Sequence, residues 1–281
     1  MRIICVAAIL AFCSVGITAL DLQCSLQYRF EDSSENSNIK KVSSVLTMSY
    51  REGELLGYTF LERFDSRGRL LEKIRHSAQI GIHTGVMGRL SKKVYYRYNN
   101  SSGSLIESQS FHADGNQSTL VKYSYGPNGC LTRKVVLSGK AEKLVNQIDY
   151  AYIDLGDKKS EVIVTRKTFI GARTVTSKRK RYVSNGRQIK ETKLNDAGKA
   201  ENSISFEYDG KGFLVKRTNC CEFNYTHEYE YVVDTRGNWI ERIEYYGRKN
   251  NAGEWEKTES LRTYRVITYY DEGSGTDKKR N

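Results

Sequence analysis

Residues 121–131, Val-Lys-Tyr-Ser-Tyr-Gly-Pro-Asn-Gly-Cys-Leu, contain the pattern that decides the fold. Tyr125 is followed four residues later by Gly129, and Pro127, the one proline of the chain, stands at the second position of the turn between them. Proline has the φ that this position needs, and glycine readily takes the left-handed conformation that ends such a turn. Apolar and polar residues alternate on both sides, as in half-buried strands. The stretch therefore predicts a β-hairpin.

The same spacing recurs along the chain. Between Tyr98 and Tyr208, successive aromatic residues of this kind lie 27, 27, 30 and 26 residues apart. The associated glycines are Gly68, Gly103, Gly129, Gly156, Gly186, Gly212 and Gly237, each expected in a turn between antiparallel strands with positive φ. We therefore expect an all-β fold: an antiparallel meander of about seven imperfect β-hairpin repeats forming one long curved sheet, an open or partly closed barrel or spiral.

The alternation around the third copy also predicts which side chains share a face. We expect one apolar face formed by Val121, Tyr123, Tyr125, Leu131, Val135 and Leu137, and a wet face that includes Lys122 and Lys134. Most of the twenty tyrosines are expected in the core, because each repeat needs a ring to fill the space that its hairpins share.

The chain divides into four segments. Residues 1–19 have the profile of a signal peptide, with Arg2 before an uncharged, largely apolar run that ends at Ala19. The competing interpretation is an uncleaved N-terminal membrane anchor. Residues 20–59 are assigned to a lead-in, 60–270 to the repeats and 271–281 to a disordered basic tail, with no membrane-spanning segment after the signal.

Cysteine usage agrees with export. Removal of the signal leaves an even number, Cys24, Cys130, Cys220 and Cys221, in a chain directed to an oxidising compartment. Four cysteines allow three pairings, of which a bridge from Cys220 or Cys221 to Cys24 or Cys130 is favoured over a strained vicinal ring. Four free thiols remain the alternative, and the histidines show no metal-ligand spacing, so neither a metal nor a cofactor is expected.

Two stretches carry a family resemblance. Residues 206–214, Phe-Glu-Tyr-Asp-Gly-Lys-Gly-Phe-Leu, and residues 229–240 resemble the tyrosine–aspartate (YD) repeats of the Rhs family. The likeness covers about residues 60–270, although the Tyr-Asp dipeptide is intact in these frames only at Tyr208-Asp209. It implies a curved sheet of hairpins on an exported bacterial protein, often described as carbohydrate-binding, in a short form without the toxin domain of large Rhs proteins.

Charge and aromatic side chains supply the candidate ligand-binding residues. The chain has a net charge of +12, and its sharpest basic run is Lys178-Arg179-Lys180-Arg181. Alternation sends Lys178 and Lys180 to one face of a strand and Arg179 and Arg181 to the other. Tyr95 and Tyr246, displaced from the apolar register, are candidate stacking platforms for sugars or bases. The alternatives are structural: the cations cover a solvent-exposed face of the sheet, and the rings fill the core.

These features favour a binding protein over an enzyme. No nucleophile elbow, phosphate loop or zinc signature is present, and His227-Glu228 is the one polar couple that merits inspection in a structure. We expect an exported binding or scaffold protein of the bacterial cell envelope, periplasmic, secreted or on the cell surface. Its partner would be an acidic or neutral glycan or an anionic envelope surface, with no specific nucleic-acid partner. A periplasmic carrier that holds an amphiphile in an aromatic groove is the alternative.

Overall fold

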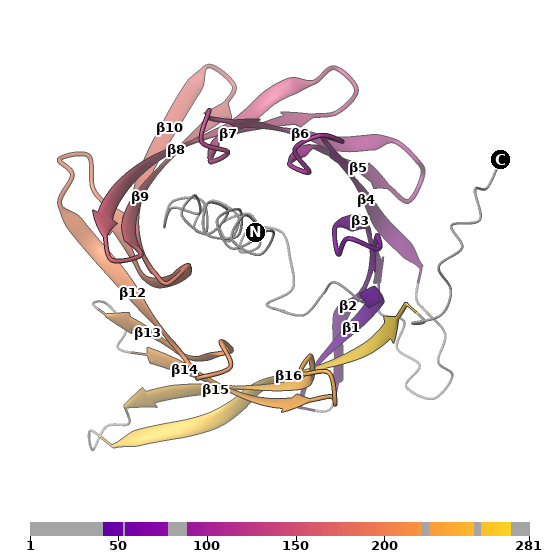
Figure 1. Cartoon of the computed structure of the whole chain (residues 1–281), viewed down its shortest axis with the longest axis vertical. Helices are drawn as coiled ribbons and strands as arrows, with labels where there is room; N and C mark the ends of the chain where they lie inside the picture. Colours follow the sequence, from indigo (N-terminus) through magenta and orange to yellow (C-terminus); the bar gives the residue numbers. More distant parts are fainter. Residues whose placement is uncertain (1–41, 53, 78–88, 221–224, 250–253, 271–281) are drawn as a thin grey trace, which may run out of the picture.

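The computed structural model describes residues 42–52, 54–77, 89–220, 225–249 and 254–270, and in these ranges sixteen strands form a closed barrel (Figure 1). The strands are β1 (Val42–Arg51), β2 (Glu54–Phe64), β3 (Leu70–Ser77), β4 (Leu90–Tyr98), β5 (Leu105–His112), β6 (Gln117–Tyr125), β7 (Leu131–Ser138), β8 (Lys143–Gly156), β9 (Lys159–Ile170), β10 (Arg173–Ser184), β11 (Arg187–Leu194), β12 (Ala200–Tyr208), β13 (Leu214–Cys220), β14 (Tyr225–Val233), β15 (Trp239–Lys249) and β16 (Trp255–Tyr269). Each strand pairs antiparallel with the next, which confirms the all-β meander.

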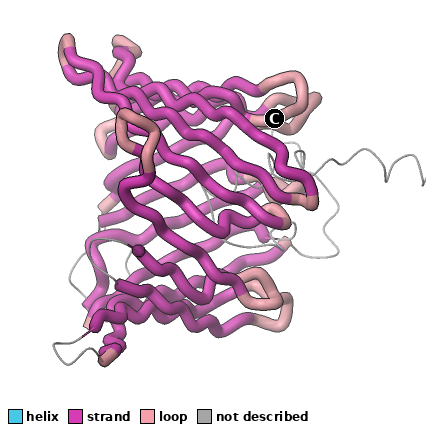
Figure 2. The backbone as a smooth tube through the Cα atoms, turned by 90° about the vertical axis from the view of Figure 1, so that its left-hand side faces the viewer, coloured by secondary structure: helices cyan, strands magenta, loops and turns pink. Residues whose placement is uncertain are grey.

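The sheet closes completely, so the expectation of an open or partly closed sheet is wrong. β1 pairs with β16 from Val42↔Tyr269 to Tyr50↔Arg262, and this pairing joins the two ends of the meander. Figure 2 shows the strands inclined to the barrel axis, as closure requires. Closure leaves no unpaired edge. Alternation and turn residues specify which strands are neighbours in the chain, but they do not specify whether the first and last strands meet.

The barrel begins earlier than the segment boundaries drawn from the sequence. Residues 42–51 form β1 and residues 54–64 form β2, so part of the lead-in assigned to residues 20–59 belongs to the wall. The signal segment 1–19 and the tail 271–281 lie outside the described residues.

Turn glycines lie where the chain reverses between consecutive strands. All seven named above have positive φ, from 71° at Gly103 to 95° at Gly212. In the third copy, the Gly129 amide donates to the Gly126 carbonyl at 3.0 Å, and the Gly126 amide donates to the Cys130 carbonyl at 2.8 Å. The pairing shifts by one residue between Ser124 and Tyr125. This geometry is a type I turn followed by a glycine bulge.

Gly129→Val should lower the free energy of unfolding by about 1–2 kcal/mol, because a β-branched residue is strained at a φ of 77°. Nothing lies within 4 Å of the added Cβ, so backbone strain alone is tested. Gly210→Ala is the matched control: its Cβ also meets open space, and Gly210 is not among the positive-φ residues. Urea unfolding measures both. Equal stability of Gly129→Val and wild type would contradict the turn assignment.

In five repeats the tyrosine binds the hairpin before it, whereas Tyr182 faces outward, opposite Glu161. Tyr125 donates its hydroxyl proton to the Leu105 carbonyl at 2.8 Å, where β5 begins. The same bond joins Tyr98 to Leu70, Tyr152 to Leu131, Tyr208 to Gln188, Tyr231 to Leu214 and Tyr270 to Phe64. These bonds link successive hairpins around the wall.

Bulges at these turns exchange the two faces of the strand that follows. Tyr125 pairs with Leu131, but Tyr123 pairs with Lys134, and Val135 pairs with Lys122. The expectation that Val135 and Leu137 share the face of Tyr123 is therefore wrong, and Lys134 lies on that face instead. The cause is the extra residue in the bulge, which shifts the alternation by one position.

Two buried clusters stabilise the wall. The larger contains Leu105, Tyr123, Leu131, Ile148, Tyr150, Val162 and Val164, from β5 to β9. The smaller contains Val42, Val45, Phe64 and Leu70 and lies at the closure of the barrel. Tyrosine rings are packed against both clusters, as the repeat pattern indicates.

Candidate functional site

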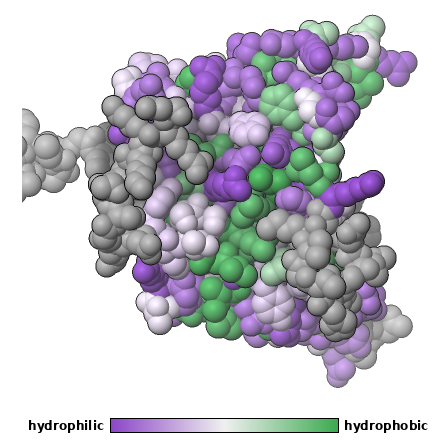
Figure 3. Space-filling model, turned by 90° about the vertical axis from the view of Figure 1, so that its right-hand side faces the viewer, coloured by the Kyte–Doolittle hydropathy of each residue, from purple (hydrophilic) through white to green (hydrophobic). Residues whose placement is uncertain are grey.

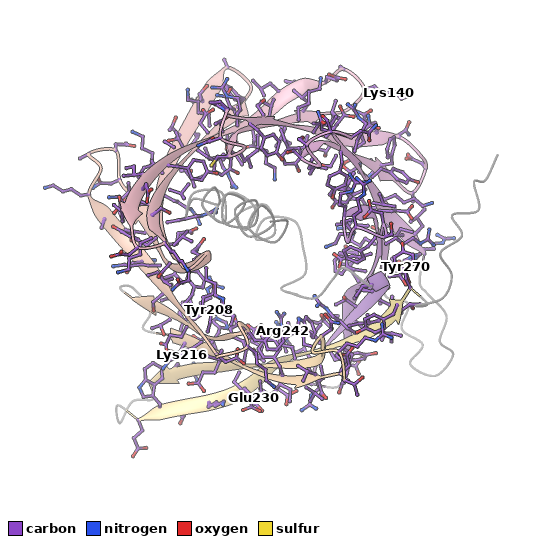
Figure 4. All side chains as sticks on the ribbon, in the orientation of Figure 1. Lys140, Tyr208, Lys216, Glu230, Arg242 and Tyr270 are labelled. Carbon is purple, nitrogen blue, oxygen red and sulfur yellow. The ribbon has the colours of Figure 1, made fainter. Side chains whose placement is uncertain are left out.

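The register of the sheet divides the side chains between an inner and an outer wall. In Figure 4, Arg242 on β15 points into the barrel and Glu230 on β14 points away from it. Residues directly opposite each other on neighbouring strands share a face. These pairings place each paired residue on the inner or the outer wall. The placements agree around the full circle, including the pair Tyr231 and Arg242. A barrel of sixteen strands is too wide for its own side chains to fill.

Basic residues predominate on the inner wall. The following sets comprise the residues inside the described strands, without the first and last of each strand and without those inserted at bulges. The inward cations are Lys73, Arg75, Lys92, Lys134, Arg166, Arg179, Arg181, Lys193, Arg217, Arg242, Arg248 and Arg265, and the inward acids are Glu62, Asp154, Glu191, Glu244 and Glu256. Twelve cations therefore face five acids.

The outer wall is more evenly balanced. By the same count it carries twelve cations, among them Lys178 and Lys216, and nine acids, among them Glu228 and Glu230. Many of them form cross-strand ion pairs, such as Arg63–Glu72 at 2.8 Å. Figure 3 shows apolar side chains on one side gathered in a strip between polar ones. The outer wall is therefore charged along most of its circumference.

A pocket of about 130 Å³ opens in the inner wall over β8, β9 and β10. Its lining consists of Ile148, Val164, Arg166, Ser177, Arg179 and Arg181, all of which the register places inward. The apolar pair beneath, Ile148 and Val164, is 5% and 7% exposed. Three guanidinium groups and a hydroxyl thus surround a small apolar floor.

One carboxylate positions two of the three guanidinium groups. Glu191, opposite Arg181 on β11, accepts from Arg179 at 2.5 Å and from Arg181 at 2.9 Å. Burial alone would raise the pKa of Glu191, but the two arginines outweigh it and hold that pKa below its usual value. The Arg179 side chain is still 51% exposed. One glutamate therefore orients both arginines, and half of the Arg179 side chain stays accessible.

Arg166 has no such partner among the described residues. It lies inward on β9, opposite Ile148 and Ser177, and it is exposed. Arg166 stands in an ordinary strand between Thr165 and Lys167, so no sequence signal points to it. Only the pairing of β9 with β10 shows that it lies beside Arg179 and Arg181.

A second inward feature is a cluster of rings on β14 and β15. Tyr225, His227 and Tyr246 lie with ring centroids 5.4–5.8 Å apart. The Nδ1 atom of His227 is 2.7 Å from Oε1 of Glu244, and this hydrogen bond lowers the pKa of Glu244. Arg217 is directly opposite His227 on β13. Rings and a cation therefore share this part of the wall.

The structure separates residues that the sequence analysis grouped together. Lys178 and Lys180 face outward, where Lys180 pairs with Glu161 at 3.0 Å, whereas Arg179 and Arg181 face inward, as alternation predicts. Tyr95 faces outward, 44% exposed and edge-on to Phe111, so it does not share a surface with Tyr246.

The couple His227-Glu228 is also divided between the walls. Glu228 lies on the outer wall within 3.1 Å of Lys257, and His227 pairs with Glu244 instead. Neighbouring residues of a strand point to opposite faces, so this couple cannot act at one site.

Of the four cysteines predicted to form disulfides, the structure describes the side chain of one, Cys130. Cys130 is 1% exposed and forms a disulfide bond. Cys24, Cys221 and the Cys220 side chain lie outside the described residues. In the described ranges no group of three or more His, Cys, Asp and Glu is placed to hold a metal ion, and no helix there is long and apolar enough to cross a membrane.

Comparisons with known proteins show no family. No family model matches the chain, and no curated protein matches it in sequence. A porin-like protein from Bacteroides uniformis is 11% identical, with a TM-score of 0.46, and the alignment covers 81% of this chain and 98% of that one. TcdB2-TccC3-TEV is also 11% identical, with a TM-score of 0.27, over 84% of this chain and 15% of that one. A Bacteroides fragilis protein of unknown function is 12% identical, with a TM-score of 0.18, over 62% of this chain and 91% of that one.

Proposed function

We propose that the protein is an exported, non-enzymatic binding protein of the bacterial envelope that holds an acidic glycan against the inner wall of its barrel. The observation that carries this proposal is the charge of that wall, where twelve cations face five acids. A concave surface of one charge sign concentrates ligands of the opposite sign. Long anionic chains gain most, because they contact several cations at once.

Two observations support the aqueous, exported setting of this proposal. The disulfide at Cys130 is typical of an oxidising compartment. The outer wall carries charged side chains in its strand interiors, for example Arg133 and Asp149, which are joined by an ion pair at 2.6 Å. A lipid-facing barrel presents an apolar band instead. We therefore infer that both walls face water.

A glycan is favoured over other polyanions by the inward rings. Tyr225 and Tyr246 stand beside a cation-bearing strand, and flat apolar rings with nearby hydrogen-bonding groups suit the faces of sugars. The resemblance to YD repeats points the same way.

Carriage of an amphiphile receives less support. Inward apolar residues such as Leu131 and Val162 are about 98–99% buried within the wall itself. An acyl chain would instead meet charged side chains such as Arg166 and Arg179 on the rest of that surface.

The proposal is tested with the purified mature chain and two forms of one polymer, polygalacturonate and its fully methyl-esterified derivative. We expect binding of the acidic form at low salt and a loss of about 10-fold or more in affinity between about 50 and 200 mM NaCl. The esterified form should not bind. Fluorescence anisotropy measures both. Equal affinity for the two forms, no binding at low salt, or tighter binding of a single-stranded polynucleotide would overturn the acidic-glycan proposal.

A further inference from the structure

The pocket over β8, β9 and β10 is a shaped site in the inner wall. Elsewhere the cations are spread over many strands, but here three guanidinium groups and the Ser177 hydroxyl converge on about 130 Å³. We propose that this pocket binds a single oxyanion group, a carboxylate, sulfate or phosphate, as the recognition subsite for one charged substituent of the ligand. This inference rests on the proposed function and deepens it.

Preorganisation is the first argument. The carboxylate of Glu191 accepts from Arg179 at 2.5 Å and from Arg181 at 2.9 Å, so both side chains are held before any ligand arrives. Holding a flexible arginine in its bound position removes the conformational-entropy cost that ligand binding would otherwise include. Arg179 remains half exposed, which leaves donors available.

Charge is the second argument. The described ion pairs of these three guanidinium groups involve one acid, Glu191, and Arg166 takes part in none of them. Arginine presents its N–H groups in a planar fork that matches the oxygens of an oxyanion. The unmatched charge and the exposed fork of Arg166 make it the residue that would contact the anion directly.

Size is the third argument. A pocket of about 130 Å³ has room for an oxyanion group, and it opens onto the wall along which a larger ligand can extend. Its floor, Ile148 and Val164, is buried and offers no hydrogen bond. The pocket therefore suits the terminal anionic group of a larger ligand, with the remainder of the ligand lying along the wall.

The test uses acetate, inorganic sulfate and inorganic phosphate as separate probes on the whole mature chain. Methyl-labelled protein reports binding through shifts of the Ile148 and Val164 methyl resonances at constant ionic strength. We expect saturable shifts with at least one probe, and the preferred probe distinguishes a planar carboxylate from a tetrahedral sulfate or phosphate.

Variants then locate the contact. Arg166→Gln should weaken the preferred probe about 10-fold or more, the equivalent of one charge-assisted contact. Arg166→Lys, which keeps the charge but loses the fork, should weaken it by less. Lys178→Gln removes the same charge from the outer wall of the neighbouring strand and should leave binding unchanged. Circular dichroism of each variant verifies that the barrel is folded.

The outcomes separate this inference from the proposed function. Linear, unsaturable shifts with every probe, or equal effects of Arg166→Gln and Lys178→Gln, would overturn the subsite. If polygalacturonate binds wild type and Arg166→Gln equally well, the subsite is overturned and the proposed function stands. If small anions fill the pocket but no polymer binds, the subsite stands and the proposed function fails.

Discussion

The triple variant Lys92→Gln, Lys134→Gln and Arg217→Gln should bind polygalacturonate about 100-fold more weakly than wild type. These residues lie on the inner wall on three separate strands, β4, β7 and β13. Each contact of a half-buried cation with a polyanion is worth about 1 kcal/mol, and three such losses amount to about 100-fold. Anisotropy titrations at one fixed salt concentration measure the change.

The sequence supplies a closely matched control. Lys93, Arg133 and Lys216 are the immediate neighbours of the three inward residues on the same strands, and they face outward. Their triple substitution by glutamine removes the same net charge from the same chain positions. It should change the affinity by less than about 3-fold, because only long-range attraction is lost. Equal weakening by the two triple variants would show that net charge, rather than the inner wall, governs binding.

Glu191→Gln should change stability and affinity in opposite directions. The substitution keeps the shape of the side chain but removes the charge that pairs with Arg179 and Arg181. Loss of charge-assisted hydrogen bonds at this buried position should lower the free energy of unfolding by about 1–3 kcal/mol. Polygalacturonate should bind more tightly, because the inner wall loses an acid and both arginines become available.

The stability difference between wild type and Glu191→Gln should also depend on pH. The arginines lower the pKa of Glu191 in the folded protein, so its charged form stabilises the fold above the usual value of 4.5. That stabilisation is lost as the pH falls through the lowered pKa. Urea unfolding at about pH 7 and about pH 3.5 should therefore show a difference that shrinks in acid. A difference that grows in acid would contradict the assigned ion pairs.

Local sequence patterns predicted the strands because they act over short distances. A turn that needs glycine at a left-handed position, as at Gly129, is recognisable from its own residues. So is the alternation that places Arg179 and Lys180 on opposite faces of the strand. The same reasoning failed at Val135, because a bulge inserts one residue and exchanges the faces beyond it. The bulge glycine is visible in the sequence and could have corrected that assignment.

The candidate site was only half predictable. Arg179 and Arg181 stand out as part of a basic run, but Arg166 and Glu191 join them only through the pairing of three strands. His227 pairs with Glu244, seventeen residues away, and not with its neighbour Glu228. Closure is the extreme case, since the contact of Ser43 with Thr268 spans 225 residues and no local pattern encodes it.

The tyrosine bonds between hairpins give the barrel a cyclic order. Five repeat tyrosines bind a carbonyl of the preceding hairpin, and Tyr270, past the end of the last strand, binds Phe64 in the first hairpin. The ring of hairpins is therefore continuous, although the chain itself is linear. The seam between β1 and β16 is held by the same kinds of bonds as any other junction. A circular permutant with its ends joined and new termini in the turn at Gly129 would contain the same set of neighbours.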